Sequence, residues 1–209
     1  MSDETYMHRC IELALKGIRK VAPNPMVGCV IVLDGKIIGE GYHEAYGEAH
    51  AEVNAINQIS DKKLLKQAKL YVSLEPCNHH GKTKPCSDLI LKHEIPEVII
   101  GVKDPNPKVG GKGIEKLENA GVKVKVNVLE TLCFEVNKRF FTFFQKKRPY
   151  VILKWAQTRD GYLDKIRDEK EQKINWISAP ETQTIVHKWR SEEQSILVGR
   201  NTIINDNPS

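Results

Sequence analysis

An Asp-Gly pair between two apolar runs constrains the fold of this chain more than any other feature. The runs are VGCVIVL (27–33) and KIIGEGY (36–42), and Asp34-Gly35 joins them. This arrangement is typical of a tight β-hairpin, because Asp and Gly tolerate the positive φ angles that such turns require. The chain is therefore expected to contain a sheet with an antiparallel pair of strands.

Helical and extended patterns alternate after this hairpin. An amphipathic helix over 3–20, capped by Ser2, is expected before it. Further helices are expected over 50–60, 86–93, 112–120 and 129–145, and strands over 69–74, 97–102 and 122–128. This order predicts the α/β class, as a three-layer domain with a mixed sheet.

The composition changes at the basic run KKRPY (146–150), which we interpret as a solvated linker. A strand over 150–156, a helix over 180–190 and a strand over 195–199 are expected after it. About 60 residues are few for an independent α/β domain. We therefore expect a first domain over 1–147 and an incomplete second domain over 148–209.

Composition narrows the cellular setting. No apolar run approaches the length of roughly 18–20 residues that a membrane span needs, and the polar start MSDETYMHRC does not resemble a secretory signal. Five cysteines, an odd number, favour a reducing compartment, so we expect a cytoplasmic protein with no membrane partner. The net charge of +5 suits a small phosphorylated substrate as well as RNA.

Three short motifs predict a metal centre. They are His50-Ala51-Glu52, Pro76-Cys77 and Pro85-Cys86, and the last two bound the segment EPCNHHGKTKPC (75–86). Zinc takes nitrogen and sulfur ligands, and a catalytic zinc keeps its fourth position for water. His50, Cys77 and Cys86 are therefore the expected ligands, and the catalytic Glu52 is expected to shuttle protons.

Two other interpretations of these motifs were weighed. A structural zinc site would need a fourth ligand and would have no use for Glu52. His79 and His80 are also possible ligands, but a catalytic site already has its three, so a substrate role for one of them is preferred. Zinc deaminases of nucleobases combine H-x-E with P-C-x-x-C, whereas eight residues separate Cys77 from Cys86 here.

Longer segments carry a family resemblance over essentially the whole chain. They are PNPMVG (23–28), GEGYHEAYGEAHAE (39–52), LEPCNHHGKTKPC (74–86), KDPNPKVGGKGI (103–114), LKWAQTRDG (153–161) and NWIS (175–178). With these segments the chain resembles the bifunctional deaminase/reductase of riboflavin biosynthesis. The resemblance implies a cytidine-deaminase-like domain followed by the start of a dihydrofolate-reductase-like domain.

The resemblance also implies an activity. The first domain would deaminate 2,5-diamino-6-(5-phosphoribosylamino)pyrimidin-4-one to 5-amino-6-(5-phosphoribosylamino)uracil with Zn2+. The family's second domain would then reduce the ribosyl group with NADP(H). Because the later strands of that domain are missing from this sequence, we expect the chain alone to lack reductase activity.

Site residues follow from the same resemblance. The expected substrate contacts are Asn24, His43, His79, Lys82, Asp104, Asn106 and, for the phosphate, Arg190. The expected NADP contacts are Ala156, Trp176, Ser178, Thr202 and Asp206. Asn24, Asp104 and Asn106 would also suit ordinary turns, and His43 a structural role. Departures from the family are Lys84 in place of proline, Arg159 in place of an apolar residue, and Ile174 in place of a small polar one.

Two rival functions remain to be compared. A tRNA or free-base deaminase would favour the short P-C-x-x-C loop, and a non-catalytic binding protein would not need an intact set of zinc ligands with Glu52. We expect a small phosphoribosylaminopyrimidine as partner, no nucleic acid, and a homo-oligomer. A phenylalanine cluster, Phe140, Phe141, Phe143 and Phe144, is expected to serve core or interdomain packing.

Overall fold

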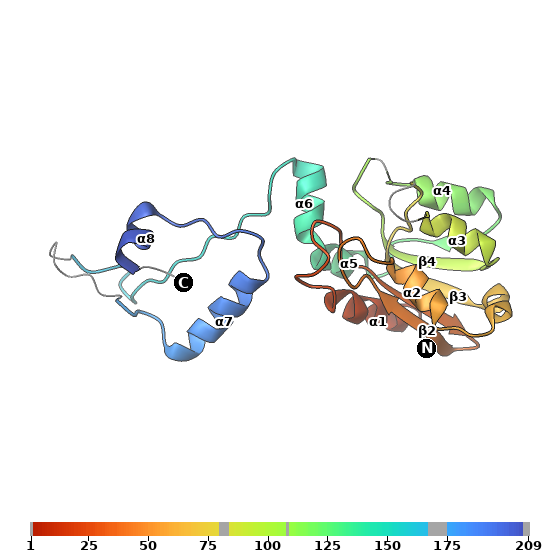
Figure 1. The fold of residues 1–209 in the computed structure, drawn as a ribbon, viewed down its shortest axis with the longest axis horizontal. Helices are drawn as coiled ribbons and strands as arrows, with labels where there is room; N and C mark the ends of the chain where they lie inside the picture. The colour runs from red at the N-terminus through yellow and green to blue at the C-terminus, as the bar shows by residue number, and fades with distance from the viewer. Residues whose placement is uncertain (1, 80–83, 108, 167–174, 207–209) are drawn as a thin grey trace. The chain divides into compact units, whose positions relative to one another are not determined.

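The structure is a computed structural model that describes residues 2–79, 84–107, 109–166 and 175–206. The chain forms two compact units, Met1–Tyr150 and Val151–Ser209 (Figure 1).

A five-stranded mixed sheet is the centre of the first unit. Its strands are β1 (Gly28–Leu33), β2 (Lys36–Tyr42), β3 (Lys69–Leu74), β4 (Glu97–Val102) and β5 (Lys123–Lys125). The spatial order is β2-β1-β3-β4-β5, with β1 antiparallel to both neighbours and β3, β4 and β5 parallel. The α/β class with a mixed sheet is therefore confirmed.

The predicted hairpin joins β1 to β2. Asp34 and Gly35 have φ angles of 49° and 76°, so both turn residues adopt the positive φ that a tight hairpin of type I′ requires. The register then pairs Gly28 with Tyr42, which brings the start of β1 beside the end of β2.

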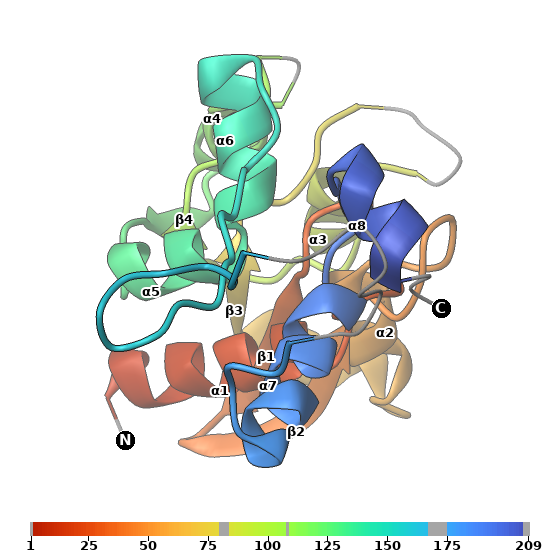
Figure 2. The ribbon, with the colours of Figure 1, turned by 90° about the vertical axis from the view of Figure 1, so that its left-hand side faces the viewer.

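Helices cover both faces of the sheet (Figures 1 and 2). On one face lie α1 (Asp3–Leu15), α5 (Glu130–Val136) and α6 (Lys138–Lys146). On the other lie α2 (Ala51–Asn57), the 3-10 helix η1 (Lys62–Gln67), α3 (Cys86–Lys92) and α4 (Lys112–Asn119). Alternation along β1 supplies both cores, since Cys29 and Ile31 face one layer and Val30 and Val32 the other. The three-layer arrangement is thus confirmed.

Three elements are shorter than their patterns predicted. Helix α1 ends at Leu15, and the chain then turns through Arg19 with a φ of 72°. Strand β5 ends at Lys125, and left-handed residues at Asn127 and Leu129 follow it. The helix expected over 129–145 is broken into α5 and α6 at Asn137.

One edge of the sheet gathers the loops that matter for function. β3 and β4 are parallel, so both end at this edge, with Leu74 beside Val102. Because β1 is antiparallel to β2 and β3, its start at Gly28 and the end of β2 at Tyr42 meet there too. Segments that are far apart in sequence therefore converge at one place.

The second unit contains helices α7 (Pro180–Ser191) and α8 (Arg200–Asp206). The helix expected over 180–190 is confirmed. The strands expected over 150–156 and 195–199 were wrong, since no strand forms among residues 151–166 and 175–206. A strand needs a neighbour to accept its backbone hydrogen bonds, and these segments have none; Leu153 and Leu197 remain 78% and 98% exposed.

None of the described helices combines the length and the apolar composition that crossing a lipid bilayer requires.

Candidate active site

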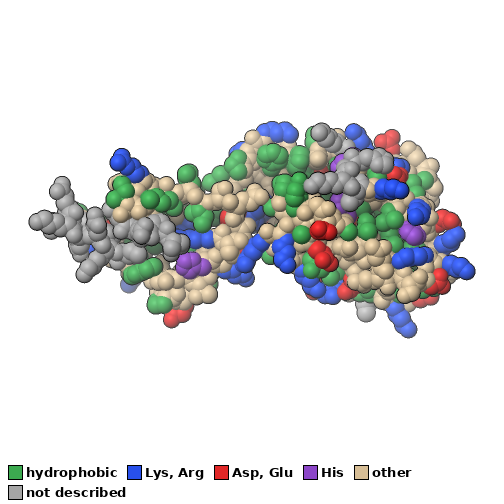
Figure 3. Space-filling model, viewed as in Figure 1, with side chains coloured by type: hydrophobic (Ala, Val, Ile, Leu, Met, Phe, Trp, Pro, Cys, Tyr) green, Lys and Arg blue, Asp and Glu red, His purple; other side chains and the backbone are tan. Residues whose placement is uncertain are grey.

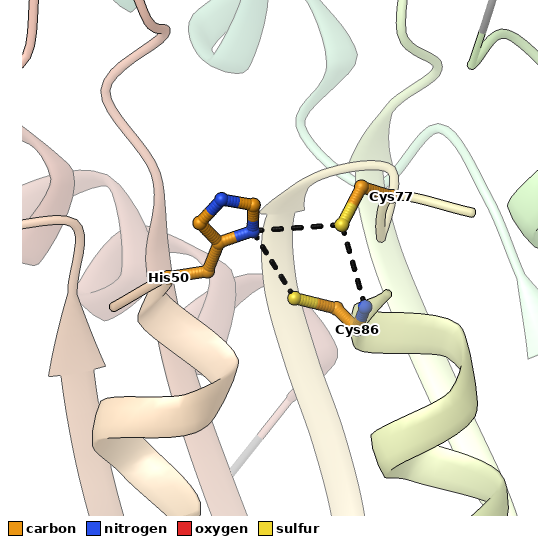
Figure 4. Close-up of side chains that lie close together, drawn as sticks. All are labelled: His50, Cys77 and Cys86. Carbon is orange, nitrogen blue, oxygen red and sulfur yellow. Dashed lines mark hydrogen bonds between the residues drawn. The ribbon is translucent and has the colours of Figure 1, made fainter. Parts of the chain in front are cut away.

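Three side chains with zinc-binding atoms converge at the edge of the sheet where β3 and β4 end (Figure 4). The Nδ1 atom of His50 lies 3.3 Å from the Sγ of Cys86 and 3.5 Å from the Sγ of Cys77. The backbone N–H of Cys86 donates to the Sγ of Cys77 over 3.3 Å. The structure therefore brings together all three ligands that the sequence predicts.

The arrangement of these atoms fits a zinc ion. With ordinary Zn–S and Zn–N bond lengths, a tetrahedral zinc holds its nitrogen and sulfur ligands about 3.6 Å apart. The observed N–S separations of 3.3 and 3.5 Å match this spacing. A set of one histidine and two cysteines also leaves one of four positions for water, as in catalytic zinc sites.

Local structure explains how the ligands are held. His50 immediately precedes α2, and Cys86 is the first residue of α3. Helix α2 packs closely on β2 at Gly41, where a Cβ atom would lie 2.4 Å from the carbonyl oxygen of Ala51. The Nδ2 of Asn54 also donates to the carbonyl oxygen of Tyr42 over 2.8 Å. His50 is thus fixed relative to the sheet before any ligand binds.

The ionisation of the three donors is already unequal. Hydrogen bonding with Cys86 lowers the pKa of Cys77 to about 4. Hydrogen bonding with Cys77 raises the pKa of His50 to about 9. The hydrogen bond between Cys86 and Cys77, together with burial, raises the pKa of Cys86 well above its ordinary value. Cys77 is therefore the donor that is a thiolate at neutral pH, the form that binds a metal.

Glu52 is a buried carboxyl group next to these donors. It lies in the first turn of α2 and is 3% exposed. Burial raises its pKa, while the charge of His50 opposes that shift. A raised pKa makes a buried carboxylate a better proton acceptor, which suits the predicted shuttle.

His43 and Asn24 form a pair beside the donors. The Nδ2 of Asn24 donates to the Nε2 of His43 over 3.1 Å, so the other ring nitrogen donates to the carbonyl oxygen of Ala49 over 3.1 Å. Burial lowers the pKa of His43, which keeps the ring neutral. Its ring also stands edge-on to that of His50, with centroids 5.5 Å apart. His43 is therefore held in one tautomer by contacts at both nitrogens.

Asp104 and Asn106 lie in the loop after β4. The backbone N–H of Asn106 donates to Oδ1 of Asp104 over 2.7 Å, which is the turn-forming contact that the sequence left open. Burial raises the pKa of Asp104 to about 6. That carboxyl group is also affected by the charge of Cys77, which places it near the donor cluster.

Most of the remaining expected residues are exposed or partly exposed. His79 is described and exposed, and Lys82 lies outside the described residues. In the second unit, Trp176 is 64% exposed and Arg190 and Thr202 are exposed. Ala156 and Ser178 are partly exposed, and Asp206 lies in α8. The described part of this unit contains helices α7 and α8 and no strand, so the NADP contacts expected there stay a prediction.

Other residues of the site were missed by reasoning from the sequence. Glu75 is buried and accepts backbone hydrogen bonds from the loop after β4. Asn78 donates to the carbonyl oxygen of Lys112 over 3.2 Å and accepts from Ser87 over 3.0 Å. Asn137 holds the backbone of Met26, close to Asn24, by two hydrogen bonds of 2.7 and 2.8 Å. Of these residues, only Glu75 could have been suspected from the sequence, because it stands two residues before the predicted ligand Cys77.

Comparison with known proteins decides the family. Residues 1–102 match the cytidine and deoxycytidylate deaminase zinc-binding region, and residues 149–209 match the RibD C-terminal domain. The riboflavin biosynthesis protein RibD of Aquifex aeolicus is 46% identical over 206 residues, covering 99% of this chain and 56% of the relative. This chain belongs to the RibD family.

Other RibD proteins agree with this assignment. RibD of Escherichia coli is 39% identical over 209 residues, covering 100% of this chain and 55% of the relative. A solved Acinetobacter baumannii RibD is 37% identical with a TM-score of 0.90, covering 99% of this chain and 56% of that one. This chain spans about half the length of the RibD proteins that it matches.

A further solved structure carries an enzyme name. It is the diaminohydroxyphosphoribosylaminopyrimidine deaminase/5-amino-6-(5-phosphoribosylamino)uracil reductase of Thermotoga maritima, 46% identical with a TM-score of 0.88. The match covers 99% of this chain and 58% of that one. The cytidine-deaminase-like fold implied by the sequence is confirmed by these RibD neighbours.

Proposed function

We propose that residues 1–147 form a zinc-dependent deaminase of riboflavin biosynthesis. Its reaction converts 2,5-diamino-6-(5-phosphoribosylamino)pyrimidin-4-one to 5-amino-6-(5-phosphoribosylamino)uracil. The observation that carries this proposal is the convergence of His50, Cys77 and Cys86 beside the buried Glu52, in a chain of the RibD family.

Within this proposal His50, Cys77 and Cys86 hold the zinc. Bound zinc lowers the pKa of a water molecule from about 15.7 toward 7, which supplies the nucleophile at neutral pH. Glu52 would take one proton from this water and pass it to a ring nitrogen. It would then take a second proton, from the hydroxyl group added to the ring carbon, and pass it to the amine, which leaves as ammonia. The raised pKa of Glu52 supports this role, because it makes the carboxylate a better proton acceptor.

The loops at the sheet edge are proposed to orient the substrate. Asn24 and the neutral His43 present fixed polar groups, and Asp104 and Asn106 border the site from the loop after β4. His79 and Lys82 belong to the segment between the two cysteines. The charge of Lys82 suits the substrate phosphate, although this residue lies outside the described part of the chain.

The second segment, 148–209, is proposed to belong to the reductase half of the family, since it matches the RibD C-terminal domain. The proposed NADP(H) contacts are Ala156, Trp176, Ser178, Thr202 and Asp206, and Arg190 would hold the substrate phosphate. Because the described residues of this unit form no sheet, no catalytic step is assigned to them. We expect this chain alone to show no reductase activity.

The proposal also covers the cellular location and the oligomeric state of the protein. All five cysteines are free, which supports a reducing, cytoplasmic location. A homo-oligomer is proposed from the family resemblance, and light scattering of the purified chain tests it.

Ammonia release tests the proposed reaction. The purified zinc-loaded chain should release ammonia from the diaminopyrimidine phosphate, and not from cytidine, guanine or tRNA. Glu52→Gln should lower the turnover number by about 10²–10⁴-fold, since it removes the proton carrier, while zinc content stays unchanged.

A matched control is Glu118→Gln, which alters an exposed carboxylate of α4 and should leave turnover unchanged. Unchanged turnover in Glu52→Gln would refute the shuttle, and preferential turnover of a base or tRNA would assign the site to another deaminase class.

A further inference from the structure

The carboxylate of Glu75 gathers four backbone N–H groups from one distant segment. Its Oε2 accepts from Asp104 over 3.2 Å and from Gly111 over 2.9 Å. Its Oε1 accepts from Gly113 over 3.1 Å and from Ile114 over 3.4 Å. The side chain is buried, so these contacts take the place of water around the charge.

Both the sequence and the fold explain why the carboxylate is needed there. Helix α4 begins after Gly111, which has a φ of 83° and no side chain to accept from the first N–H groups of the helix. Helix starts leave such groups unpaired and favour a nearby negative charge. Glu75 thus caps α4 from another part of the chain.

Glu75 also belongs to the segment that carries the predicted zinc ligand Cys77. It directly follows β3 and stands two residues before Cys77, and its own N–H donates to the carbonyl oxygen of Val102 over 3.0 Å. The first turn of α4 also lies against the next peptide, since a Cβ on Gly113 would lie 2.1 Å from the carbonyl oxygen of Pro76. The segment that carries Cys77 and the loop that carries Asp104 are therefore joined through one side chain.

We infer that Glu75 is a positioning residue, which fixes the loop of Asp104 and Asn106 relative to the zinc ligand Cys77. This inference rests on the proposed deamination, in which that loop borders the substrate. Replacing the carboxylate by an amide turns one acceptor into a donor that faces N–H groups, so two of the four hydrogen bonds are lost. The loop then moves relative to Cys77, while the three zinc ligands keep their own contacts.

The test compares Glu75→Gln with the wild-type zinc-loaded chain. We expect the KM for the diaminopyrimidine phosphate to rise about tenfold, with less change in kcat, as for the loss of a contact that acts on substrate binding. Zinc content should remain that of the wild type. Hydrogen exchange at the amides of Gly111, Gly113 and Ile114 should become faster, while exchange in β1 and β2 stays unchanged.

Glu97→Gln is the matched control. Glu97 accepts from Lys69 and Lys123 at the opposite end of β4, so its replacement removes a paired carboxylate away from the site. It should change neither KM nor exchange at the start of α4. If Glu75→Gln does not fold, Glu75→Asp keeps the charge on a shorter side chain, and the same rise in KM is expected.

Defined outcomes overturn the inference. Faster exchange at α4 with an unchanged KM would show that the loop does not position substrate. Loss of zinc with an unchanged KM would assign Glu75 to the metal site alone. Wild-type protein that releases no ammonia would overturn the proposed function, whereas active wild type with an equally active Glu75→Gln overturns only the role of Glu75.

Discussion

Aliphatic side chains of the same kind have opposite surroundings in the two units. In the first unit Ile31, Leu70 and Ile100 are completely buried between the sheet and its helices. In the second unit Leu153 and Leu197 are mostly exposed, and apolar side chains reach its surface (Figure 3). Both segments have apolar runs that predict strands, yet among the described residues only those of the first unit form paired strands.

This difference shows what a strand pattern does and does not establish. An apolar run becomes a strand only when a neighbouring segment completes its backbone hydrogen bonds and covers its side chains. In the first unit β1 pairs with β2 after a two-residue turn, and β3 pairs with the other side of β1. Among residues 151–166 and 175–206 no strand forms, and apolar side chains such as Leu153 and Leu197 stay exposed.

Truncating an aliphatic side chain is expected to give the largest difference in the free energy of unfolding between the two units. Ile31→Ala should lower the free energy of unfolding by about 2–5 kcal/mol, because it leaves a cavity in a packed core. Leu153→Ala should change it by less than about 0.5 kcal/mol, because this side chain is exposed. Urea unfolding followed by circular dichroism measures both, and equal losses would mean that Leu153 is buried in solution.

An intermediate effect is expected from the two hydrogen bonds between the Asn137 side chain and the backbone of Met26. Asn137→Ala removes both hydrogen bonds to the backbone of Met26 and leaves buried groups unpaired, at a cost of about 1–3 kcal/mol. Asn175→Ala is its control in the second unit, where the amide makes an exposed contact with Asp164. Thermal unfolding distinguishes the two, and a stable Asn137→Ala would show that water replaces the lost contacts.

The smallest effect is expected from one carboxylate at the surface. A hydrogen bond from Lys125 lowers the pKa of Asp3 below 3.8, so Asp3 stabilises the folded state above that pH. The contribution is lost as the pH falls through the lowered value. Asp3→Asn should therefore melt slightly below the wild type at pH 7 and together with it in strong acid.

Glu181→Gln changes an exposed carboxylate of α7 in the second unit and serves as the control. It should not alter the melting temperature at either pH. A gap between Asp3→Asn and the wild type that persists in acid would show that charge is not the cause.

Much of the fold followed from local rules. The Asp34-Gly35 turn, the two strands beside it and the strands over 69–74 and 97–102 were predicted at their observed positions. The hairpin depends on neighbours that are close in sequence, whereas the strands over 69–74 and 97–102 were recognised from their own short apolar runs. The convergence of His50, Cys77 and Cys86 was also predictable, because histidine and cysteine near helix starts and strand ends have few other uses in this pattern.

What the sequence missed depends on distant partners. The break at Asn137 follows from a contact with Met26, which is 111 residues away. Glu75 takes its role from N–H groups located 29 to 39 residues later, and backbone groups leave no mark in a sequence. The strands expected after Tyr150 failed for the same reason, since pairing is a property of the neighbour as well as of the strand.

The hairpin turn lies at the end of β1 that faces away from the zinc ligands. Six residues of strand separate Gly28 from this turn, a distance of roughly 20 Å. Apart from the hairpin itself, the turn is held by a hydrogen bond from the hydroxyl of Tyr6 to the carbonyl oxygen of Gly35. Asp34-Gly35 is therefore a suitable attachment point for a fluorescent or affinity label, because a probe there leaves the thiolates free and the opposite edge open to substrate.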